Sequence, residues 1–589
     1  MSNPSTDAVC YPYPYSVVDG CLYMETTNKN GKSTRKLCNF LPYLTSDVTV
    51  DDGAVQSRTL QIAGIHESGR MLPEIEVSAK EFKTMDWALE RWGADCIIEP
   101  GKSNKDWVCN AIQQTVKDAE KKTVYHVTGW KKIDRKWTYL LPNDESHDIR
   151  LFGKLNRYRK AQGWSDTDLR TVWSMLKEKL IAPQIIVWTL IAYVFLTPLN
   201  EFLHQVFYEP KFVLYLIGRT GTRKSTLAAL FLSFFGKFSG SDLPMSFCDT
   251  QNSILNNISV LKDTLTCIDD FHPGVHKQEM KDTDIAQAID RAYGDRVGKG
   301  RLNQDCTAKE NRPPHGNAIV TGETIPAVGE SGTARTFILE FKRSDVNLEN
   351  LSFFQKEAKQ GTLMNCLLSY IEWIQGCYLH NDSAQEMLRE NLTNSFESYR
   401  EEFLKAVTHC HGRVAEIVAW LTIGMAFFLE FLYARGVIEI YERDSALNDF
   451  RDDLYVLAEK QSKVIEQDKP THVFIQKLYS LIESGQAVVL NRVHPPEYLP
   501  KGFVGYEDDE NYYLNADAAH TMVKSLCEKQ DEHFTITKNA LLQALAEEGI
   551  LERNQKSGKN TKSLNVNGKT KRLLWIPKSE FDYIVSLGE

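Results

Sequence analysis

The fold is decided by the stretch Lys211-Phe-Val-Leu-Tyr-Leu-Ile-Gly-Arg-Thr-Gly-Thr-Arg-Lys-Ser225. From Lys211 to Ile217 it is a nearly continuous apolar run, as expected of a strand buried on both faces of a sheet. A glycine-containing loop follows, and a helix is predicted to begin near Ser225. Backbone N–H groups at such a junction, together with the helix N-terminus, form a cradle for anions. The stretch therefore predicts a phosphate-binding loop that follows a buried strand.

The loop residues are of the types that phosphate binding needs. Glycines supply permissive dihedrals, Lys224 would reach the β- and γ-phosphates, and the Ser225 hydroxyl would hold Mg²⁺. The commonest pattern has glycine before the lysine, whereas this chain has Arg223, which loosens the match. The predicted ligands are ATP and Mg²⁺, and the predicted nucleotide-binding residues are Gly218, Gly221, Thr222, Arg223, Lys224, Ser225 and Thr226.

The region around the loop alternates between strand and helix patterns. Five short apolar runs are strand candidates, and helical patterns separate them, which predicts a parallel sheet with helices on both faces. These runs are residues 211–217, 245–248, 265–269, 317–321 and 336–341.

Two carboxylates end the third strand candidate, in Leu265-Thr-Cys-Ile-Asp-Asp270. Asp269 would hold Mg²⁺ through water, and Asp270 would orient or activate the attacking water. Glutamate is commoner in the second place, so the assignment of the base is less secure than that of the metal ligand. A solvated pair of aspartates at a strand end is the alternative reading.

Two further catalytic candidates follow along the chain. Glu323, after the fourth strand candidate, is the first choice for a sensor of the γ-phosphate, with Thr321 and Asn317 behind it. Arg335 precedes the fifth strand candidate. In AAA+ ATPases an arginine there usually points at the nucleotide of the neighbouring subunit, where a guanidinium suits transition-state charge. The alternative is a surface arginine.

Two basic segments are candidate DNA contacts. The segment 298–316 is too long for a plain connection, and a β-hairpin inserted there would place Arg301, Lys309 and Arg312 against phosphates. Near the C-terminus, lysines that include Lys559 and Lys562 crowd a loop in the outline of a winged helix. There a helix at 516–530 and one capped by Thr537 precede strands expected at 550–551 and 572–576. An exposed, solvated loop has the same composition in both places.

The whole chain reads as a multidomain α/β protein. Its 589 residues carry a net charge of −9, so a DNA-binding reading depends on local basic patches. Residues 1–155 look β-rich, with strands near 59–63, 123–127 and 137–141 and helices near 78–92 and 105–120. The predicted domains are a β-rich domain at 1–155, a helical linker at 156–208, an ATPase core at 209–345, a helical lid at 346–468 and a winged-helix domain at 469–589.

Metal clusters and membrane spans are not favoured by the sequence. The twelve cysteines include no Cys-x-x-Cys pair, and the neighbours in His409-Cys-His411 would point in different directions. The apolar runs 185–199 and 413–433 read as buried helices, because the first is short for a span and the second contains Glu430. A cytoplasmic protein with reduced cysteines and without membrane contact is expected.

Taken together, these motifs resemble the MCM-like AAA+ helicases of staphylococcal cassette chromosome elements and the wider family of phage, plasmid and island ATPases. Loops of the MCM type also lack glycine before the lysine, and in this chain Arg223 occupies that position. The resemblance implies an AAA+ core, a hexameric ring, a hairpin in its channel, a C-terminal winged helix and unwinding of DNA. It is carried by Trp107, Gly129-Trp130, Trp137-Thr-Tyr-Leu-Leu-Pro142, Pro198-Leu199, Phe212-Val-Leu-Tyr-Leu216, Asp249-Thr-Gln-Asn252, Lys262-Asp263, Ile268-Asp-Asp-Phe-His-Pro273, Thr321-Gly-Glu323 and Arg335.

Three functions remain open on the sequence. The leading one is a replicative helicase of a mobile genetic element, which would translocate on single-stranded or forked DNA and hydrolyse ATP at subunit interfaces. The second is an origin-binding initiator that uses ATP as a switch without processive unwinding. The third is an AAA+ protein remodeller, in which aromatic residues would be expected at the pore.

Overall fold

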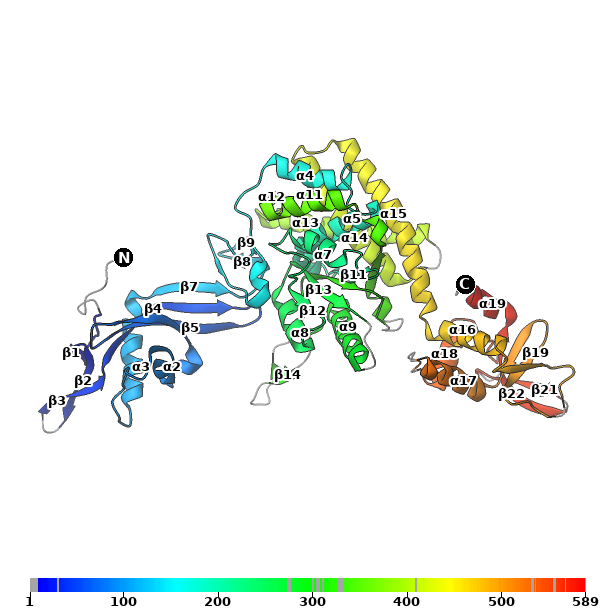
Figure 1. Cartoon of the computed structure of the whole chain (residues 1–589), viewed down its shortest axis with the longest axis horizontal. Helices are drawn as coiled ribbons and strands as arrows, with labels where there is room; N and C mark the ends of the chain where they lie inside the picture. The colour runs from blue at the N-terminus through cyan, green and yellow to red at the C-terminus, as the bar shows by residue number, and fades with distance from the viewer. Residues whose placement is uncertain are drawn as a thin grey trace. The chain divides into compact units, whose positions relative to one another are not determined.

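The structure is a computed structural model that describes residues 9–28, 31–272, 277–298, 301–302, 308–309, 312–326, 332–407, 410–496, 498–530, 534, 536–554, 558–566 and 568–587. The chain forms two compact units. The first unit contains residues 1–161 together with the short segments 256–262 and 300–312, and the second contains the rest. Figure 1 labels many of the helices and strands of both units.

The first unit is built mainly from strands. A five-stranded sheet has the order β10-β7-β4-β5-β6, a three-stranded sheet has the order β1-β2-β3, and β8 pairs with β9. The strands expected near 59–63, 123–127 and 137–141 overlap β5, β7 and β9. The bounds are β1 (Tyr15–Val18), β2 (Cys21–Asn28), β3 (Gly31–Cys38), β4 (Phe40–Asp51), β5 (Gln56–His66), β6 (Met71–Ser78), β7 (Glu120–Tyr125), β8 (Gly129–Ile133), β9 (Lys136–Leu140) and β10 (Asp148–Ile149).

Three α-helices accompany these strands: α1 (Ala79–Phe82), α2 (Asp86–Trp92) and α3 (Asn104–Gln114). The single helix predicted at 78–92 is wrong, because Met85 adopts a left-handed conformation with φ of 58° and separates α1 from α2. The break lets α2 bury both of its tryptophans, Trp87 and Trp92, whose rings meet edge to face at 5.3 Å. Local helical periodicity does not report such a break.

The second unit contains a five-stranded sheet with the order β12-β13-β16-β11-β17, in which every pairing is parallel. The parallel sheet predicted from the apolar runs is therefore confirmed. β11 lies inside the sheet between β16 and β17, and all of its residues are buried. The strands are β11 (Val213–Ile217), β12 (Met245–Ser246), β13 (Leu265–Phe271), β16 (Asn317–Gly322) and β17 (Thr336–Glu340). The helices between them in the chain are α7 (Lys224–Leu232), α8 (Gln251–Val260), whose second half belongs to the first unit, and α9 (Lys277–Asp295).

A group of helices packs beside this sheet (Figure 1). α5 and α14 contact each other closely, and Phe195 stacks on Phe428 with 4.1 Å between ring centroids. The Tyr193 hydroxyl donates to the Ala318 carbonyl at 3.2 Å, which ties α5 to β16. The bounds are α4 (Asp166–Leu176), α5 (Gln184–Leu196), α6 (Asn200–Gln205), α11 (Leu348–Gln360), α12 (Thr362–Tyr378), α13 (Asp382–Ala406), α14 (Gly412–Ala434) and α15 (Ile440–Gln467).

Two helical segments in the described part of the chain are long and apolar enough to cross a membrane by length and composition alone, Gln184–Gln205 and Gly412–Ala434. In the fold, 89% and 78% of their most apolar windows are buried inside the protein. Both therefore pack as core helices here, as the sequence predicts for the runs 185–199 and 413–433.

The C-terminal part of the second unit combines a sheet of order β18-β19-β20-β22-β21 with four helices. Thr537 caps α18 as predicted, since its hydroxyl accepts from the Ala540 amide at 3.4 Å. The bounds are α16 (Pro470–Glu483), β18 (Val488–Asn491), β19 (Phe503–Glu507), β20 (Asn511–Leu514), α17 (Ala516–Lys529), α18 (Lys538–Glu547), β21 (Lys562–Val566), β22 (Lys569–Pro577) and α19 (Lys578–Ser586).

The predicted strand at 550–551 is wrong. Residues 562–566 form the strand that pairs with the first half of β22, and β20 pairs with its second half. The segment after α18 reaches β22 through the Glu552 amide, which donates to the Trp575 carbonyl at 3.0 Å. Ile550 and Leu551 are instead buried in the core that the helices and the sheet share. Their apolar side chains resemble a strand in sequence because they fill this core.

Candidate functional site

The predicted phosphate-binding loop lies at the carboxyl end of β11, and α7 begins at Lys224 directly after it. Gly221 has a φ of +83° and Arg223 a φ of +72°, so the loop makes two left-handed turns before the helix. A Cβ at Gly218 would lie 2.6 Å from the Phe341 carbonyl oxygen, so that position has no room for a side chain. Arg223 thus holds the conformation that explains why glycine is common at its position.

Lys224 lies at the mouth of this loop. Its Nζ donates to the Gly218 carbonyl at 2.6 Å and to the Arg219 carbonyl at 3.2 Å. Partial burial lowers the pKa of Lys224, and the surrounding carboxylates oppose that shift. The ammonium is thus aimed into the loop, where it can reach a bound phosphate.

The remaining loop residues predicted to bind nucleotide lie in the same turn. Thr222 is buried, and its hydroxyl has no hydrogen-bond partner in the described part of the chain. Thr226 lies in the first turn of α7, where a Cβ at Gly240 would meet its backbone at 3.1 Å.

Ser225, Asp269 and Thr321 meet at the carboxyl edge of the sheet. The Ser225 hydroxyl donates to Asp269 Oδ1 at 2.7 Å, and the Thr321 hydroxyl donates to the same oxygen at 2.5 Å. The structure therefore brings together the two predicted Mg²⁺ ligands from α7 and β13. A hydroxyl and a carboxylate are oxygen donors of the kind that Mg²⁺ prefers.

Asp270 lies beside this cluster in an irregular part of the strand. Its φ is +68°, and the register between β13 and β16 shifts between Ile268 and Phe271. The Asp270 amide donates to the Thr321 hydroxyl at 3.0 Å, which holds the distorted turn. Because of that turn, the backbone at Asp270 departs from the regular ladder between β13 and β16.

Glu323 faces the phosphate loop from the end of β16. It accepts a hydrogen bond from the Thr220 hydroxyl, and its Oε2 lies 3.2 Å from His272 Nδ1. These contacts lower the pKa of Glu323, with the Thr220 hydrogen bond as the largest cause. The sequence had not singled out Thr220 or given His272 a role, although both lie within the motifs that define the site.

Arg335 lies at the end of the sheet where its parallel strands begin, opposite the end that carries the phosphate-binding loop. It precedes β17, whose Thr336 pairs with Val213 at the start of β11. The phosphate loop follows the other end of β11, which is about 16 Å away along a five-residue strand. Arg335 is instead held on α9, where its Nη2 contacts Asp295 Oδ1 at 2.9 Å and Oδ2 at 3.1 Å.

The predicted hairpin is present as backbone. β14 (Arg301–Leu302) pairs antiparallel with β15 (Ala308–Lys309), and Arg301 is opposite Lys309. The side chains of Arg301 and Lys309 lie outside the described residues. Arg312 forms an ion pair with Asp52 at 2.6 Å within the first unit.

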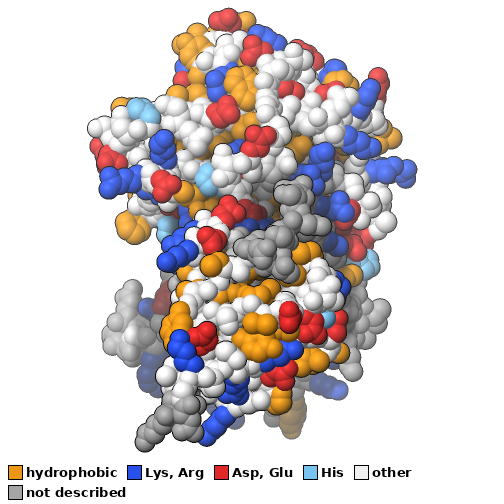
Figure 2. All heavy atoms as spheres, turned by 90° about the vertical axis from the view of Figure 1, so that its left-hand side faces the viewer, with side chains coloured by type: hydrophobic (Ala, Val, Ile, Leu, Met, Phe, Trp, Pro, Cys, Tyr) orange, Lys and Arg blue, Asp and Glu red, His pale blue; other side chains and the backbone are white. Residues whose placement is uncertain are grey.

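The predicted C-terminal lysines are divided between a loop and a strand. Lys559 lies in the loop before β21, where its carbonyl accepts from the Asn554 amide at 2.9 Å. Lys562 begins β21, forms an ion pair with Glu552 and lies over the Trp575 ring at 4.9 Å. On the face drawn in Figure 2, Lys and Arg side chains are interspersed with Asp and Glu side chains among the described residues.

Comparisons with known proteins find similarity among solved structures. No family model and no curated protein matches the sequence. Among solved structures, one described as "SCCmec type IV Cch - active helicase" is similar, with a TM-score of 0.59 and 13% sequence identity. The similarity covers 98% of this chain and all of that one. At this identity the likeness shows a shared fold.

Proposed function

We propose that this chain is an ATP-driven DNA helicase of a mobile genetic element. The observation that carries the proposal is the Ser225–Asp269–Thr321 cluster beside Lys224, at the carboxyl edge of a parallel sheet. Nucleotides bind at this edge of open α/β sheets. The likeness in fold over nearly the whole chain to a structure described as an active helicase supports the choice among ATPases.

The nucleotide site would act as follows. The loop amides and Lys224 would bind the phosphates of ATP, and Ser225 and Asp269 would hold Mg²⁺. The metal ion, when bound, neutralises charge on the phosphates. Asp270 accepts the proton of the attacking water, and Glu323, poised by Thr220 and His272, registers the γ-phosphate.

We propose that the subunits form a ring, and the position of Arg335 supports this. It lies at the edge of the sheet remote from its own phosphate loop, so it would complete the site of a neighbouring subunit. In that ring, which we propose is a hexamer of AAA+ cores, the Asp295 carboxylate holds the guanidinium extended from α9. Hydrolysis would then occur at subunit interfaces.

DNA contacts are proposed for two places. The β14–β15 hairpin carries Arg301 and Lys309, and Arg312 follows it. We propose that the C-terminal α/β part is a winged helix, whose basic side chains include Lys559 and Lys562. Contacts of lysine and arginine with phosphates would make binding strongly dependent on salt.

The proposal is tested by Lys224→Ala in the full-length protein. We expect loss of ATP hydrolysis and of strand displacement on a forked duplex, because the ammonium that binds the phosphates is removed. Lys237→Ala is the matched control, since Lys237 is an exposed lysine shortly after α7. Strand displacement that persists in Lys224→Ala would exclude the assignment.

The two rival functions give different results. An ATP-switched initiator would bind DNA in a nucleotide-dependent way without displacing a strand. A protein remodeller would have little need of the hairpin lysine, so Lys309→Ala would leave DNA-stimulated ATPase unchanged. For the helicase we expect Lys309→Ala to reduce that stimulation and to lessen the salt dependence of DNA binding by the equivalent of about one phosphate contact.

A further inference from the structure

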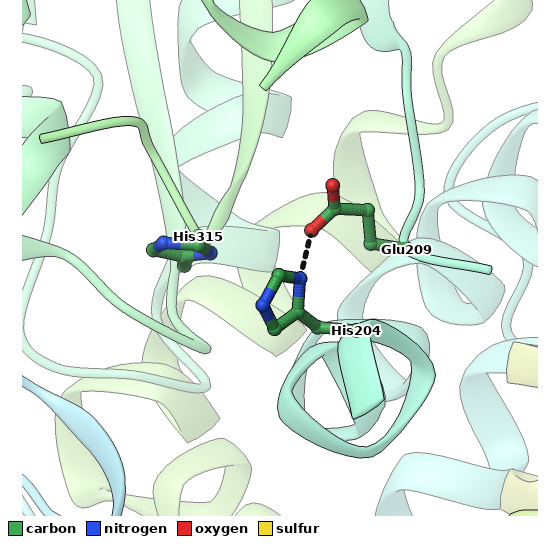
Figure 3. A group of neighbouring side chains, drawn as sticks. All are labelled: His204, Glu209 and His315. Carbon is green, nitrogen blue, oxygen red and sulfur yellow. Dashed lines mark hydrogen bonds and ion pairs between the residues drawn. The ribbon is translucent and has the colours of Figure 1, made fainter. Parts of the chain in front are cut away.

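Three side chains that commonly bind metal ions meet away from the nucleotide site (Figure 3). His204 comes from α6, Glu209 from the turn that leads to β11, and His315 from the segment that leads to β16. One ligand atom from each lies within 4.8 Å of those from the other two. His204 Nδ1 is 2.6 Å from Glu209 Oε2, and the two imidazole rings meet edge to face at 5.2 Å.

The backbone around His315 is held in place from several sides. Its carbonyl accepts from Asn200 Nδ2 at 3.1 Å and from the Asp263 amide at 3.3 Å. Asn200 and His204 are four residues apart on α6, so they share one face of the helix. The same helix face thus grips the backbone of His315 and presents an imidazole to its ring.

The neighbouring Arg296 holds the backbone on both sides of His315 and the backbone directly after Glu209. Its buried guanidinium donates to the Pro314 carbonyl at 2.7 Å and the Gly316 carbonyl at 2.8 Å, on either side of His315. It also donates to the Pro210 carbonyl at 2.8 Å, directly after Glu209. The positions of two of the three candidate ligands are therefore set by a network that does not involve their side chains.

The contact between His204 and Glu209 favours the charged form of both groups, because it raises the pKa of His204 and helps to lower that of Glu209. Burial alone would raise the pKa of Glu209, but the hydrogen bond with His204 and the charge of Arg296 bring it below its usual value. A carboxylate that faces positive charge on one side and an imidazole on the other can accept a metal ion in place of the imidazole proton. The Glu209 charge also offsets that of Arg296, which would otherwise repel a cation.

We propose that His204, Glu209 and His315 bind a divalent transition-metal ion of the Zn²⁺ class, with water as the fourth ligand. Two imidazoles and one carboxylate are a ligand set that zinc accepts. With bonds of about 2.0–2.1 Å in a tetrahedron, ligand atoms lie roughly 3.3 Å apart. The His204–Glu209 contact would have to open by less than 1 Å and the most distant pair to close by at most about 1.5 Å. Half of the His204 side chain, 52%, is exposed, which leaves a route for the ion and its water.

Such an ion would join α6 to residues 313–316, the segment through which the chain returns from the β14–β15 hairpin to β16. Metal binding would therefore stiffen the base of the hairpin-bearing insertion. This consequence depends on the fold alone and holds whether or not the chain unwinds DNA.

The test uses the full-length protein freed of metal with a chelator, with ADP and excess Mg²⁺ present to saturate the nucleotide site. Co²⁺ is added and its visible absorption is followed, since a tetrahedral Co²⁺ site absorbs far more strongly than aqueous Co²⁺. Zn²⁺ is then added to displace it. We expect one equivalent of absorbing Co²⁺, bleached by Zn²⁺.

The variants are His204→Ala, Glu209→Gln and His315→Ala, with His380→Ala as the control at an exposed histidine elsewhere. We expect each ligand variant to weaken Co²⁺ binding by at least about 100-fold, more than the loss of a supporting group costs, and the control to match the wild type. Circular dichroism before metal addition identifies any variant that does not fold, and Glu209→Gln keeps the shape of the site. Equal titrations for the wild type and the folded ligand variants, or no absorbing Co²⁺ at all, would overturn the proposal.

Discussion

Arg223 adopts a backbone conformation that glycine reaches most easily. Its φ of +72° places it in the left-handed region immediately before α7, between a glycine loop and the helix. A left-handed conformation costs an ordinary residue about 1–3 kcal/mol, and β-branched residues tolerate it least. The position of Arg223 in the phosphate-binding loop therefore requires a residue that can adopt the left-handed backbone conformation.

Substitutions at Arg223 can separate the effect of its backbone conformation from the effect of its guanidinium charge. Arg223→Gly should change ATP affinity by less than about fivefold, since the extra chain entropy of glycine costs about 0.4–1 kcal/mol. Arg223→Val should weaken ATP binding by about 5- to 150-fold, which corresponds to 1–3 kcal/mol. Isothermal titration with a non-hydrolysable ATP analogue measures both. If the two variants lose affinity equally, the guanidinium itself binds the nucleotide and the conformational account is wrong.

At the scale of elements, α5 and α14 approach each other closely in the core of the second unit. Gly424 on α14 lies against α5 so closely that a Cβ there would be 2.1 Å from the Ala192 carbonyl oxygen and 2.9 Å from Leu196 Cβ. The backbone of α5 cannot yield as a flexible side chain would. The absence of a side chain at Gly424 is thus what permits the two core helices to cross.

Gly424→Ala should therefore destabilise the second unit by about 1–3 kcal/mol, the usual effect of overpacking a core. The matched control is Gly376→Ala on α12, where a Cβ would meet nothing within 4 Å. There alanine should stabilise the helix by about 0.5–1 kcal/mol, because glycine loses more chain entropy. Scanning calorimetry should show a lower melting temperature for the first variant and an unchanged or higher one for the second. A melting temperature for Gly424→Ala equal to that of the control would refute the close-packing argument.

At the scale of the whole molecule, the position of Arg335 bears on whether one chain could complete the proposed ATP site by itself. The phosphate loop and Arg335 lie at opposite ends of adjacent parallel strands, β11 and β17. Asp295 on α9 holds the guanidinium there, so Arg335 does not reach its own phosphate-binding loop in this structure. An assembled ring would supply the missing neighbour.

Mixing two inactive variants tests this arrangement. Arg335→Ala and Lys224→Ala should each lose ATPase activity, and an equal mixture should recover part of it. If subunits assemble at random, about a quarter of interfaces would combine an intact loop with an intact arginine. Arg170→Ala, at an exposed arginine on α4, should stay active by itself. A mixture that stays inactive, although mass photometry shows mixed assemblies, would place Arg335 outside the neighbour's site.

The sequence by itself determined the local chemistry. The apolar run before Gly218 predicted a strand buried on both faces, and β11 is buried throughout. The paired aspartates predicted that Asp269 lies near Ser225, and the Ser225 hydroxyl does donate to the Asp269 carboxylate. These features depend on residue type and spacing within one segment. They can therefore be predicted from the physical rules of helix, strand and loop formation.

Only the tertiary structure decided which distant residues share a site. Thr321 joins Asp269 and Thr220 joins Glu323 because neighbouring parallel strands end at one edge of the sheet. The break of the predicted helix at Met85 and the pairing of β21 with β22 also depend on packing partners far along the chain. The grouping of His204, Glu209 and His315 is the clearest case. These residues come from α6 and from the segments that precede β11 and β16, and nothing in the sequence of the three segments predicts that they meet. Local patterns report burial and turns, whereas the meeting of separate segments depends on the free energy of the whole core.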